Sequence, residues 1–222
     1  MHWELLDGMS ADDQARVLGT ARRRQFRRGE IVLREGDPAD CMHLIEAGVF
    51  AVEVTAVGGE RAMLNVLAPG DFFGELALVT SARQSPRTAT ILALSPGQTL
   101  TITAQAFAAL RGTHPEVERL LVSALARRVD QLSSRLLEAL YTGVDRRVFR
   151  RLLDLAEIFD DGGNGVVIPL SQEDLATMAG ASRPTVNQVL QRLVARDVIA
   201  LGRRQIAIRD LAALHAAAAS ED

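Results

Sequence analysis

The segment 69–90, PGDFFGELALVTSARQSPRTAT, combines residue types that can bind a small phosphate. Arg87 can supply a fork of N–H donors to a phosphodiester, and Glu75 can accept hydrogen bonds from the hydroxyl groups of a sugar. Small residues let a ligand approach backbone N–H groups closely. These small residues are Gly74, Thr88 and Ala89. Because a phosphate and a ribose together make a nucleotide, the segment predicts a nucleotide sensor rather than a catalyst.

The surrounding sequence predicts a β-rich domain. Between about residues 27 and 103, β-branched runs such as GVFAVEVTAV alternate with turns marked by glycine. Regular spacing of short strands and turns is typical of an antiparallel barrel or jelly roll. The punctuating glycines are Gly29, Gly36, Gly48, Gly58, Gly59, Gly70, Gly74 and Gly97. A short helix is expected before this region, at residues 10–21, with Ser10 as its N-cap.

Residues 114–140 predict one long helix, because this stretch lacks glycine and carries proline only in its first turn. About 25 residues at 1.5 Å each would reach roughly 38 Å, which is longer than a small barrel can cover. We therefore expect part of the helix to pair with the same helix of a second subunit. Apolar residues recur every three or four positions along this stretch and would form a continuous seam, as in a coiled coil. Its members are Val117, Leu121, Leu125, Val129, Leu132, Leu136 and Ala139.

A helix-turn-helix is predicted in the last third of the chain, after a helix at 144–156. Ser171 can cap a short helix with Asp174 at its third position, and Gly180 can end it in a left-handed turn. Ser182 can cap the next helix, which has Pro184 in its first turn. Two capped helices joined by a short glycine turn form the motif that places a second helix in the major groove of DNA.

The second helix of this motif would carry the residues that contact DNA. An arginine can bond to guanine in two places, and asparagine or glutamine can do the same for adenine. The outward-facing residues are Arg183, Thr185, Asn187, Gln188 and Gln191. Ser171, Ser182 and Thr185 are suited to phosphate contacts. The hairpin VIALGRRQIAI, expected to turn at Gly202, would act as a wing that brings Arg203 and Arg204 to the flanking backbone.

Composition excludes several other classes of protein. The 222 residues suffice for two domains, and no apolar run approaches the roughly 18 residues of a membrane span. The single cysteine, Cys41, is expected to be a half-buried strand residue and excludes an internal disulfide. The four histidines lack metal-ligand spacing, so we expect no metal, haem or iron–sulfur cluster. Net charge is −3, so DNA affinity must come from local clusters of arginine.

Two motifs resemble one family. GDFFGELAL followed by PRTAT resembles the phosphate-binding cassette of the cyclic-nucleotide-binding domains of the Crp/Fnr regulators, and LSQEDLATMAGASRPTVNQVLQRL resembles their recognition motif. The resemblance covers nearly the whole chain. It implies an α+β fold with an antiparallel β jelly-roll domain at 1–113, a dimerisation helix and hinge at 114–142, and a winged helix-turn-helix domain at 143–222.

The same resemblance assigns roles in the cassette. Glu75 would bind the ribose 2′-hydroxyl, and Arg128 would face the site and pair with Glu75. Other residues would bind the cyclic phosphate, namely Gly74, Leu76 and Ala77 through their backbone together with Arg87, Thr88 and Ala89. The polar pair that reaches adenine in cAMP-responsive relatives reads Leu132-Ser133 here, so Ser133 could bond a base edge while Leu132 offers apolar contact. The segment between Glu75 and Arg87 is slightly longer than in cAMP-binding members.

In the recognition motif, Arg183 matches the position of the arginine that contacts guanine in the family. The acidic residue that follows it in the family and contacts a base is replaced by Pro184 here, and a later arginine is replaced by Gln188. The DNA half-site should therefore differ from that of the cAMP receptor.

We therefore expect a dimeric, sequence-specific transcription regulator of the bacterial cytoplasm, gated by a cyclic nucleotide with cAMP favoured. Its expected partners are double-stranded DNA, a second copy of the chain and RNA polymerase, with no membrane. The alternative is a constitutive or other-ligand DNA-binding regulator whose jelly roll is a scaffold or a polymerase-docking surface. An enzyme is not expected, because the motifs assemble no nucleophile, base and orienting group.

Overall fold

The computed structural model describes residues 3–6, 9–59, 61–79, 85–160 and 165–219. The chain divides into two compact units. One contains Met1–Arg61 and Asn65–Gln131, and the other contains Ala62–Leu64 and Leu132–Asp222. Among the described residues, no helix is both long enough and apolar enough to cross a bilayer.

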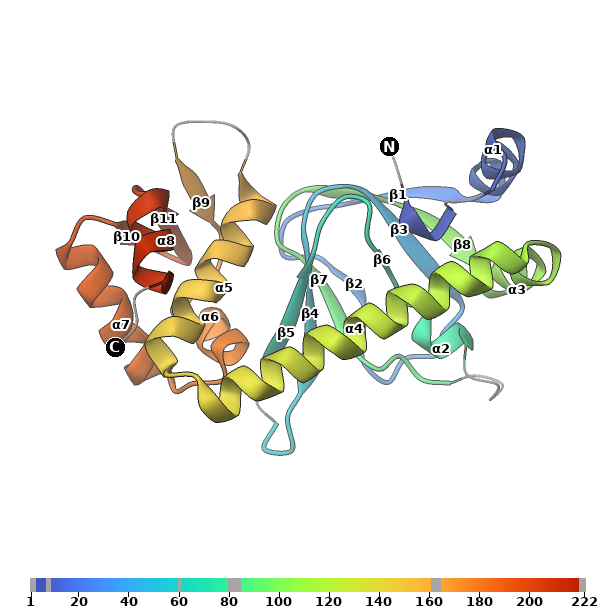
Figure 1. Ribbon diagram of the computed structural model, residues 1–222. Helices are drawn as coiled ribbons and strands as arrows, with labels where there is room; N and C mark the ends of the chain where they lie inside the picture. Colours follow the sequence, from blue (N-terminus) through green and yellow to red (C-terminus); the bar gives the residue numbers. More distant parts are fainter. Residues whose placement is uncertain (1–2, 7–8, 60, 80–84, 161–164, 220–222) are drawn as a thin grey trace. The chain divides into compact units, whose positions relative to one another are not determined.

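Two four-stranded sheets form the first unit, apart from the segment Ala62–Leu64, which groups with the second unit (Figure 1). One sheet has the order β1-β8-β3-β6, with bounds Arg22–Phe26, Gly97–Thr103, Cys41–Ala47 and Phe72–Phe73. The other has the order β2-β7-β4-β5, with bounds Ile31–Leu33, Thr90–Ala93, Phe50–Thr55 and Arg61–Leu67. The pairs β1–β8, β8–β3, β3–β6, β2–β7 and β7–β4 run antiparallel. This is the jelly roll that the glycine-punctuated runs predict.

Aromatic side chains fill the core between the sheets. Phe50 is fully buried, and its ring meets the ring of Phe26 edge-on at 6.0 Å and the ring of Phe73 at 5.7 Å. Ile45 and Ile91 belong to the same cluster. Alternate residues of each strand point to this layer, because successive side chains of a strand lie on opposite faces.

A second core lies where helices cover the end of the jelly roll. It collects side chains from the 3₁₀ helix η1 (Glu4–Leu6), from α3 (Ala104–Thr113) and from the start of the long helix α4 (Pro115–Tyr141), with α1 (Ala11–Thr20) packed against it. Trp3 donates a hydrogen bond from Nε1 to the carbonyl oxygen of Ile45 at 3.0 Å, which fixes the N-terminal segment on β3. The predicted helix at 10–21 is confirmed, since Ser10 caps α1 by accepting a bond from the backbone of Asp13.

Helix α4 confirms the predicted long helix, but its apolar seam has two parts. Val117 and Leu121 are buried in the core of their own unit. Further along, Val129, Leu132 and Leu136 are 56–60% exposed. The first two members of the seam are therefore buried within the chain, and Leu125 is partly buried against the same core. The open part of the seam begins at Val129, about two turns after Leu121.

The second unit contains a helix-turn-helix. Its elements are α5 (Val144–Phe159), β9 (Val166–Ile168), α6 (Gln172–Ala179), α7 (Arg183–Ala195), β10 (Ile199–Gly202), β11 (Gln205–Ile208) and α8 (Leu211–Ala219). The three strands form a sheet of order β10-β11-β9. The predicted helices at 171–179 and from 182 onward are confirmed, and α5 runs three residues past the predicted end at 156.

Three local predictions are wrong. The arginine-rich strand β1 precedes the predicted start of the β region near residue 27. The wing turns at Arg203-Arg204 rather than at Gly202, because Gly202 still pairs with Gln205 and Arg204 adopts a left-handed φ of 54°. Cys41 is buried, with 7% of its surface exposed, rather than half-buried.

Gly48 provides a test of close packing in the jelly roll. Gly48 and Gly29 have the same φ of +82°, but a Cβ on Gly48 would lie 2.5 Å from both the Cα of Gly97 and the carbonyl oxygen of Pro96, whereas a Cβ on Gly29 would meet nothing within 4 Å. We expect Gly48→Ala to lower the free energy of unfolding by roughly 1–3 kcal/mol more than Gly29→Ala. Urea unfolding followed by the fluorescence of Trp3, the only tryptophan, measures both variants. Equal losses would contradict the packing account.

Candidate functional site

The cassette begins at a sharp turn between β6 and the short helix α2 (Leu76–Val79). Gly74 makes this turn with a φ of +87°, a conformation that side chains rarely adopt. A Cβ at this position would lie 2.8 Å from Nη1 of Arg87 and 3.2 Å from the carbonyl oxygen of Cys41. Glycine is therefore required both by the backbone conformation and by the approach of the arginine.

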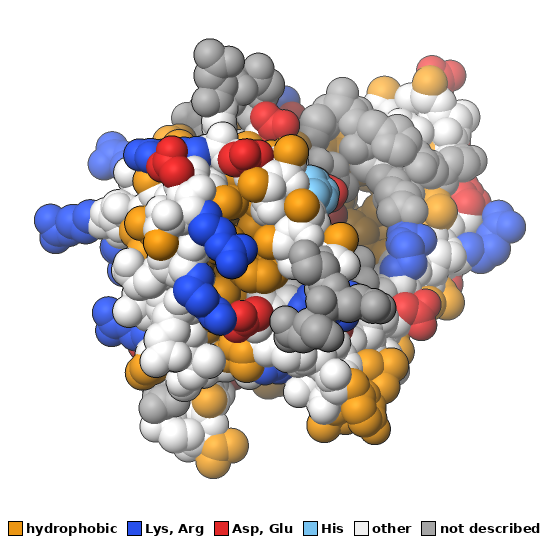
Figure 2. Space-filling view, turned by 60° about the vertical axis from the view of Figure 1, so that its left-hand side comes forward, with side chains coloured by type: hydrophobic (Ala, Val, Ile, Leu, Met, Phe, Trp, Pro, Cys, Tyr) orange, Lys and Arg blue, Asp and Glu red, His pale blue; other side chains and the backbone are white. Residues whose placement is uncertain are grey.

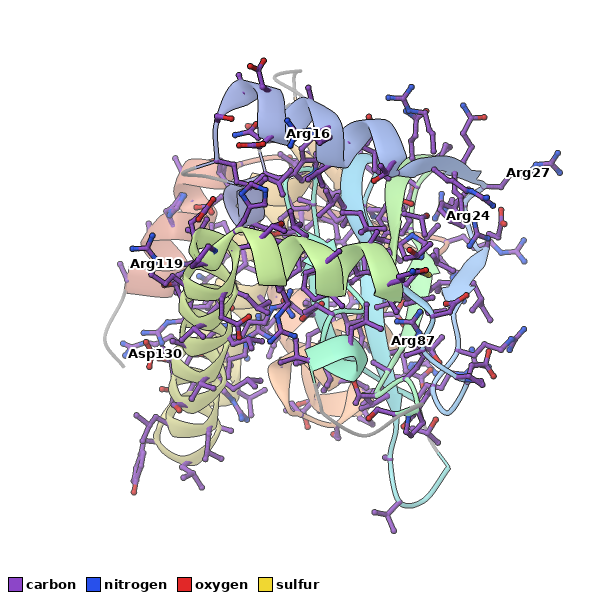
Figure 3. All side chains as sticks on the ribbon, turned by 90° about the vertical axis from the view of Figure 1, so that its right-hand side faces the viewer. Arg16, Arg24, Arg27, Arg87, Arg119 and Asp130 are labelled. Carbon is purple, nitrogen blue, oxygen red and sulfur yellow. The ribbon has the colours of Figure 1, made fainter. Side chains whose placement is uncertain are left out.

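Arg87 is buried and held by protein groups. Its side chain is 3% exposed, Nη1 donates to the carbonyl oxygen of Gly74 at 3.0 Å, and Nη2 donates to Oδ1 of Asp40 at 3.1 Å. Figure 3 shows Arg87 within the fold, while Arg24 and Arg27 extend from the surface. The side chain of Asp40 is 84% exposed, so water can compete for its carboxylate. An incoming phosphate would compete with Asp40 for the same guanidinium.

Glu75 is also paired within the protein. Its side chain is 1% exposed and accepts a hydrogen bond from Nη1 of Arg128 on α4. The other terminal nitrogen of Arg128 donates to the carbonyl oxygen of Phe72 at 2.9 Å, and the guanidinium lies over the Phe72 ring at 5.1 Å. The pairing expected from the sequence is present, and it joins the cassette directly to the long helix.

The other predicted ligand-binding residues have different environments. Leu76 is 42% exposed, Ala77 lies in α2, Thr88 is exposed and Ala89 is half-buried. Ser133 is exposed on α4 and belongs to the second unit. The part of the predicted cassette at 80–84 lies outside the described residues. Within the first unit the structure thus brings together Gly74, Glu75 and Arg87 with Arg128.

Sequence reasoning missed Asp40. An isolated antiparallel bridge between Pro38 and Pro86 brings the turn after β2 beside Arg87, and the backbone N–H of Arg87 donates to the carbonyl oxygen of Asp37 at 2.8 Å.

A hydrogen bond from the Cys41 thiol, with a smaller effect of Arg87, lowers the pKa of Asp40. Burial, reinforced by Asp40, raises the pKa of the Cys41 thiol to about 11, so this cysteine stays a neutral thiol.

The second unit holds the predicted DNA-contacting residues. Ser171 and Asp174 form a complete capping box on α6, with the Ser171 N–H donating to Asp174 at 2.8 Å. Gly180 ends α6 with a φ of 59°, and Ser182 caps α7 by accepting a bond from the backbone of Thr185. The Ser171 and Ser182 hydroxyls are therefore engaged in capping, which fixes the angle at which α7 leaves the turn.

Helix α7 separates an apolar face from a polar one. Val186, Val189, Leu190 and Leu193 are buried, as the sequence predicts. On the other face, Arg183 and Gln188 are exposed and Thr185 and Asn187 are half-buried. The space-filling view shows arginine side chains standing out between apolar ones on the face that it presents (Figure 2).

The arginines near this motif are loosely held. Arg183 lies 3.9 Å from Glu173, and Arg204 of the wing lies 3.9 Å from Asp174, with both arginines about two-thirds exposed. Arg203 is exposed beside Arg204. Exposed pairs at this separation contribute little to stability, so these side chains are available to phosphates and base edges.

Taken together, a jelly roll with a phosphate-type cassette and a separate winged helix-turn-helix define a ligand-sensing DNA-binding protein. Residues 23–114 match the family described as cyclic nucleotide-binding domain, and residues 146–217 match the family described as Crp-like helix-turn-helix domain. Among the described residues, no group of three or more His, Cys, Asp or Glu side chains is arranged to hold a metal ion.

Similarity to characterised proteins extends over both units. A CRP-like cAMP-activated global transcriptional regulator of Mycobacterium tuberculosis is 31% identical over 83% of this chain and 83% of its own. The cyclic AMP receptor protein of Thermus thermophilus is 28% identical over 95% and 94%. The solved structure of the c-di-GMP-responsive regulator CLP of Xanthomonas campestris, at 20% identity, has the same fold with a TM-score of 0.74 and covers 90% of this chain and 99% of that one.

The chain belongs to the Crp/Fnr family. It is a Crp-like DNA-binding transcription regulator with a cyclic-nucleotide-binding domain.

His43, on the strand behind Gly74, makes the first unit sensitive to acid. Its ring stacks on Phe73 at 4.8 Å, its Nδ1 lies 2.9 Å from Oγ1 of Thr99, and burial lowers its pKa from 6.5 to about 3. Between pH 6.5 and about pH 3, the unfolded chain binds a proton at His43 that the folded chain excludes. The contribution of neutral, buried His43 to the stability of the fold is therefore full above pH 6.5 and is lost as the pH falls toward 3.

We expect the stability advantage of the native protein over His43→Gln to shrink by up to about 1.4 kcal/mol per pH unit below pH 6.5. Urea unfolding followed by Trp3 fluorescence at pH 7.5 and pH 5 measures this difference. A pH-independent difference would show that the folded and unfolded chains bind the His43 proton equally well, which contradicts the lowered pKa.

Proposed function

We propose that this protein is a homodimeric transcription regulator whose affinity for DNA is controlled by a cyclic nucleotide, with cAMP favoured. The proposal rests on one observation above all, the ion pair between the cassette residue Glu75 and Arg128 of α4. In this proposal residues 1–113 bind the nucleotide, 114–142 form the dimerisation helix and hinge, and 143–222 bind DNA. The protein would act in the bacterial cytoplasm, with RNA polymerase as a further partner.

The chemistry of the cassette suits a cyclic nucleotide. The guanidinium of Arg87 would exchange the exposed carboxylate of Asp40 for the cyclic phosphate, which is also an anion. Backbone N–H groups of the turn and α2, with Thr88 and Ala89, would complete the phosphate site; the residues of that turn are Gly74, Glu75, Leu76 and Ala77. Glu75 would accept a bond from the ribose hydroxyl, and Ser133 would reach the base. The names of the relatives from M. tuberculosis and T. thermophilus favour cAMP.

The open stripe on α4 supports the dimer. Large apolar side chains on this helix are more than half exposed, although such groups gain free energy when they leave water. Pairing with the same helix of a second copy would bury them in a seam with coiled-coil spacing. The exposed residues are Val122, Val129, Leu132, Leu136, Leu137 and Leu140.

DNA recognition is assigned to α7 and the wing. Arg183, Asn187 and Gln188 would read base edges from the N-terminal half of α7. Phosphate contacts would come from the capping serines, from Thr185 and from the wing, and these residues are Ser171, Ser182, Thr185, Arg203 and Arg204.

Gating requires the nucleotide to bind one arrangement of the protein more tightly than another. Glu75 provides the link, because a ribose hydroxyl and Arg128 would share one carboxylate. A change in how that carboxylate holds Arg128 acts on α4, which runs without interruption from the first unit into the second.

One observation favours the alternative of a constitutive or other-ligand regulator. Both charged residues of the cassette already have protein partners, Glu75 with Arg128 and Arg87 with Asp40, so neither needs a ligand to be satisfied. The solved relative of the same fold from X. campestris is described as responsive to c-di-GMP, which makes that dinucleotide the natural comparison.

Calorimetric titration with cAMP, cGMP and c-di-GMP tests the ligand assignment. We expect saturable binding of cAMP that is lost in Arg87→Ala, because the fork of donors to the phosphate is removed. Asp40→Asn should bind cAMP several-fold more tightly, because the phosphate would no longer compete with a carboxylate for Arg87, and an ion pair to a carboxylate this exposed contributes at most about 1 kcal/mol. Arg24→Ala is the matched control, because Arg24 lines the same surface cavity as Arg87 but is exposed.

Arg183→Ala tests the separate assignment of DNA recognition to α7. It should retain cAMP binding and lose discrimination among DNA sequences, which selection from a random pool of duplexes would measure. Unchanged cAMP binding in Arg87→Ala, or no binding of any of the three nucleotides, would overturn the cassette assignment.

A further inference from the structure

A cavity of about 220 Å³ lies within the second unit, among the last part of α4, the first half of α5 and the end of α6. No residue of the cassette and none of the DNA-contacting residues assigned above lines it. The cavity is therefore separate from both of those sites. More than half of its lining residues are apolar. These apolar residues, all of the second unit, are Met63, Leu64, Leu132, Leu136, Ala139, Met178 and Ala179.

Arg147 of α5 contributes a buried positive charge to the cavity lining. Only 8% of its surface is exposed, and its Nε has no hydrogen-bond partner in the part of the chain that the structure describes. Its Nη1 makes one long hydrogen bond, to the carbonyl oxygen of Ala139 at 3.4 Å, and a Cβ on Gly180 would lie 3.5 Å from the same nitrogen. The guanidinium thus lies between two residues of the cavity wall. Because a buried N–H group without an acceptor is costly, a ligand that supplied an acceptor would bind favourably.

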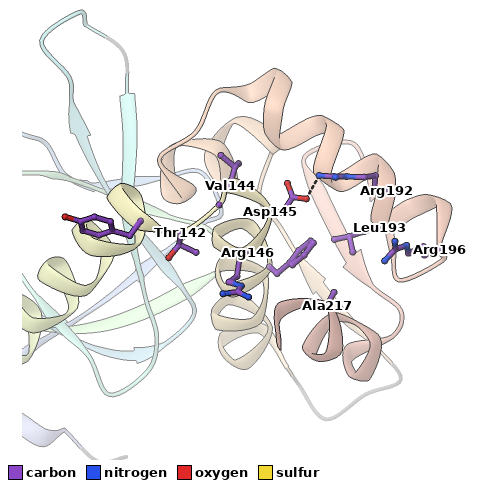
Figure 4. Close-up of a pocket in the computed structure, with 11 residues that line it drawn as sticks. Thr142, Val144, Asp145, Arg146, Arg192, Leu193, Arg196 and Ala217 are labelled. Atoms are coloured by element: carbon purple, nitrogen blue, oxygen red, sulfur yellow. Dashed lines mark hydrogen bonds and ion pairs between the residues drawn. The ribbon is translucent and has the colours of Figure 1, made fainter. Parts of the chain in front are cut away.

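The carboxylate at the start of α5 does not neutralise Arg147. Asp145 pairs with Arg192, drawn as a dashed line in Figure 4. Both residues line a groove that also holds Arg146 but not Arg147. Successive residues of a helix point about 100° apart. The side chain of Arg147 therefore leaves α5 on a different face from Arg146 and enters the cavity.

Glu138, a carboxylate in the cavity lining, is already held by two other arginines. It accepts bonds from Arg150 at 2.7 Å and from Arg151 at 3.0 Å. Arg151 also pairs with Asp154 at 3.1 Å. Among the residues that the structure describes, no carboxylate lies within salt-bridge distance of Arg147. Its charge is buried without a counter-ion, which favours the binding of an anion.

The shape and surroundings of this charge favour a carboxylate with a hydrocarbon chain. The nitrogens of a guanidinium can bond to both oxygens of one carboxylate. A doubly charged phosphate would lose more water here without gaining enough partners, because Arg135 in the lining already donates to the carbonyl oxygen of Leu64 at 2.6 Å. A volume of 220 Å³ has room for roughly seven water-sized groups, which is the number of non-hydrogen atoms in pentanoate.

We propose that this cavity binds a small aliphatic monocarboxylate, with its carboxylate on Arg147 and its hydrocarbon chain against the apolar wall. The ligand would contact the last part of α4 and, at Thr177, Met178 and Gly180, the helix-turn-helix. It would therefore favour one arrangement of the helix-turn-helix on α4 over others and change the affinity for DNA. The cavity would be a second effector site, independent of the cassette.

NMR of the methionine methyl groups of the full chain, titrated with sodium pentanoate, tests this assignment. Met63 and Met178 line the cavity, whereas Met9 and Met42 are buried in the core of the first unit. We expect saturable shifts of Met63 and Met178 at millimolar pentanoate or below, and no shift of Met9 or Met42. Each CH₂ group removed from the ligand, from pentanoate to butanoate and propanoate, should weaken binding about fourfold.

Arg147→Met and Arg150→Met are matched variants, because each removes one arginine from α5 and only Arg147 lines the cavity. Arg147→Met should fold, since an apolar side chain replaces a buried charge that has no counter-ion. It should weaken pentanoate binding roughly tenfold or more. Arg150→Met should leave binding unchanged, because Arg151 still holds Glu138. Measured by fluorescence anisotropy, pentanoate should change the DNA affinity of the native protein and of Arg150→Met but not that of Arg147→Met.

Experiments on the native protein decide the proposal even if Arg147→Met does not fold. Pentanamide, which is neutral and of the same size, should bind roughly tenfold or more weakly than pentanoate, as should inorganic phosphate. Several outcomes would overturn the proposal. These are no saturable shift of Met63 and Met178, equal shifts of all four methionines, an affinity for pentanamide or phosphate equal to that for pentanoate, and unchanged pentanoate binding in Arg147→Met.

Discussion

The buried carboxylate of Glu75 constrains the rest of the molecule. A charge removed from water is costly unless a partner of opposite sign and further hydrogen bonds compensate it. With 1% of its side chain exposed, Glu75 depends on Arg128, and Arg128 in turn is held by the Phe72 carbonyl and ring. The cassette turn, the end of β6 and the long helix are therefore parts of one interaction. A ligand that bonds to Glu75 acts on all three.

Helix α4 carries this interaction along the chain. In the first unit it is fixed by buried apolar residues and by the Glu75–Arg128 pair. In the second unit Glu138 accepts bonds from Arg150 at 2.7 Å and from Arg151 at 3.0 Å, which fastens the end of α4 to α5. Between these two attachments its apolar residues are exposed. The helix is thus attached through arginine–carboxylate pairs at its midpoint and near its C-terminal end, and the stretch between them offers apolar side chains to a partner.

Locally encoded features were predictable from the sequence. The helix-turn-helix depends on caps at Ser171 and Ser182 and on the left-handed Gly180, each of which acts within a few residues of the chain. The jelly roll follows from turn glycines between β-branched runs. Glu75 and Arg128 are 53 residues apart in the sequence. Their pairing was predicted from the family resemblance and not from any local pattern.

Features that depend on tertiary contacts were not predictable. Strand β1 reads RRRQF, with four exposed residues and one buried, so it lacks the alternation that signals a strand. Asp40 reaches Arg87 only because the Pro38–Pro86 bridge joins distant loops. The burial of Val117 and Leu121 depends on α1 and Trp3, and the repeat spacing alone did not distinguish them from the exposed part of the seam.

The measurement that tests the central claim most directly is the affinity for a DNA site selected from a random pool, with and without saturating cAMP, by fluorescence anisotropy. The native protein should bind that DNA roughly tenfold or more tightly when cAMP is present, within the usual range of coupling between sites. Arg128→Lys keeps a cation beside Glu75 but loses the two-pronged contact to Glu75 and Phe72, so the ratio should fall toward one. An affinity of the native protein that is the same with and without cAMP, or a ratio that Arg128→Lys leaves unchanged, would contradict the account.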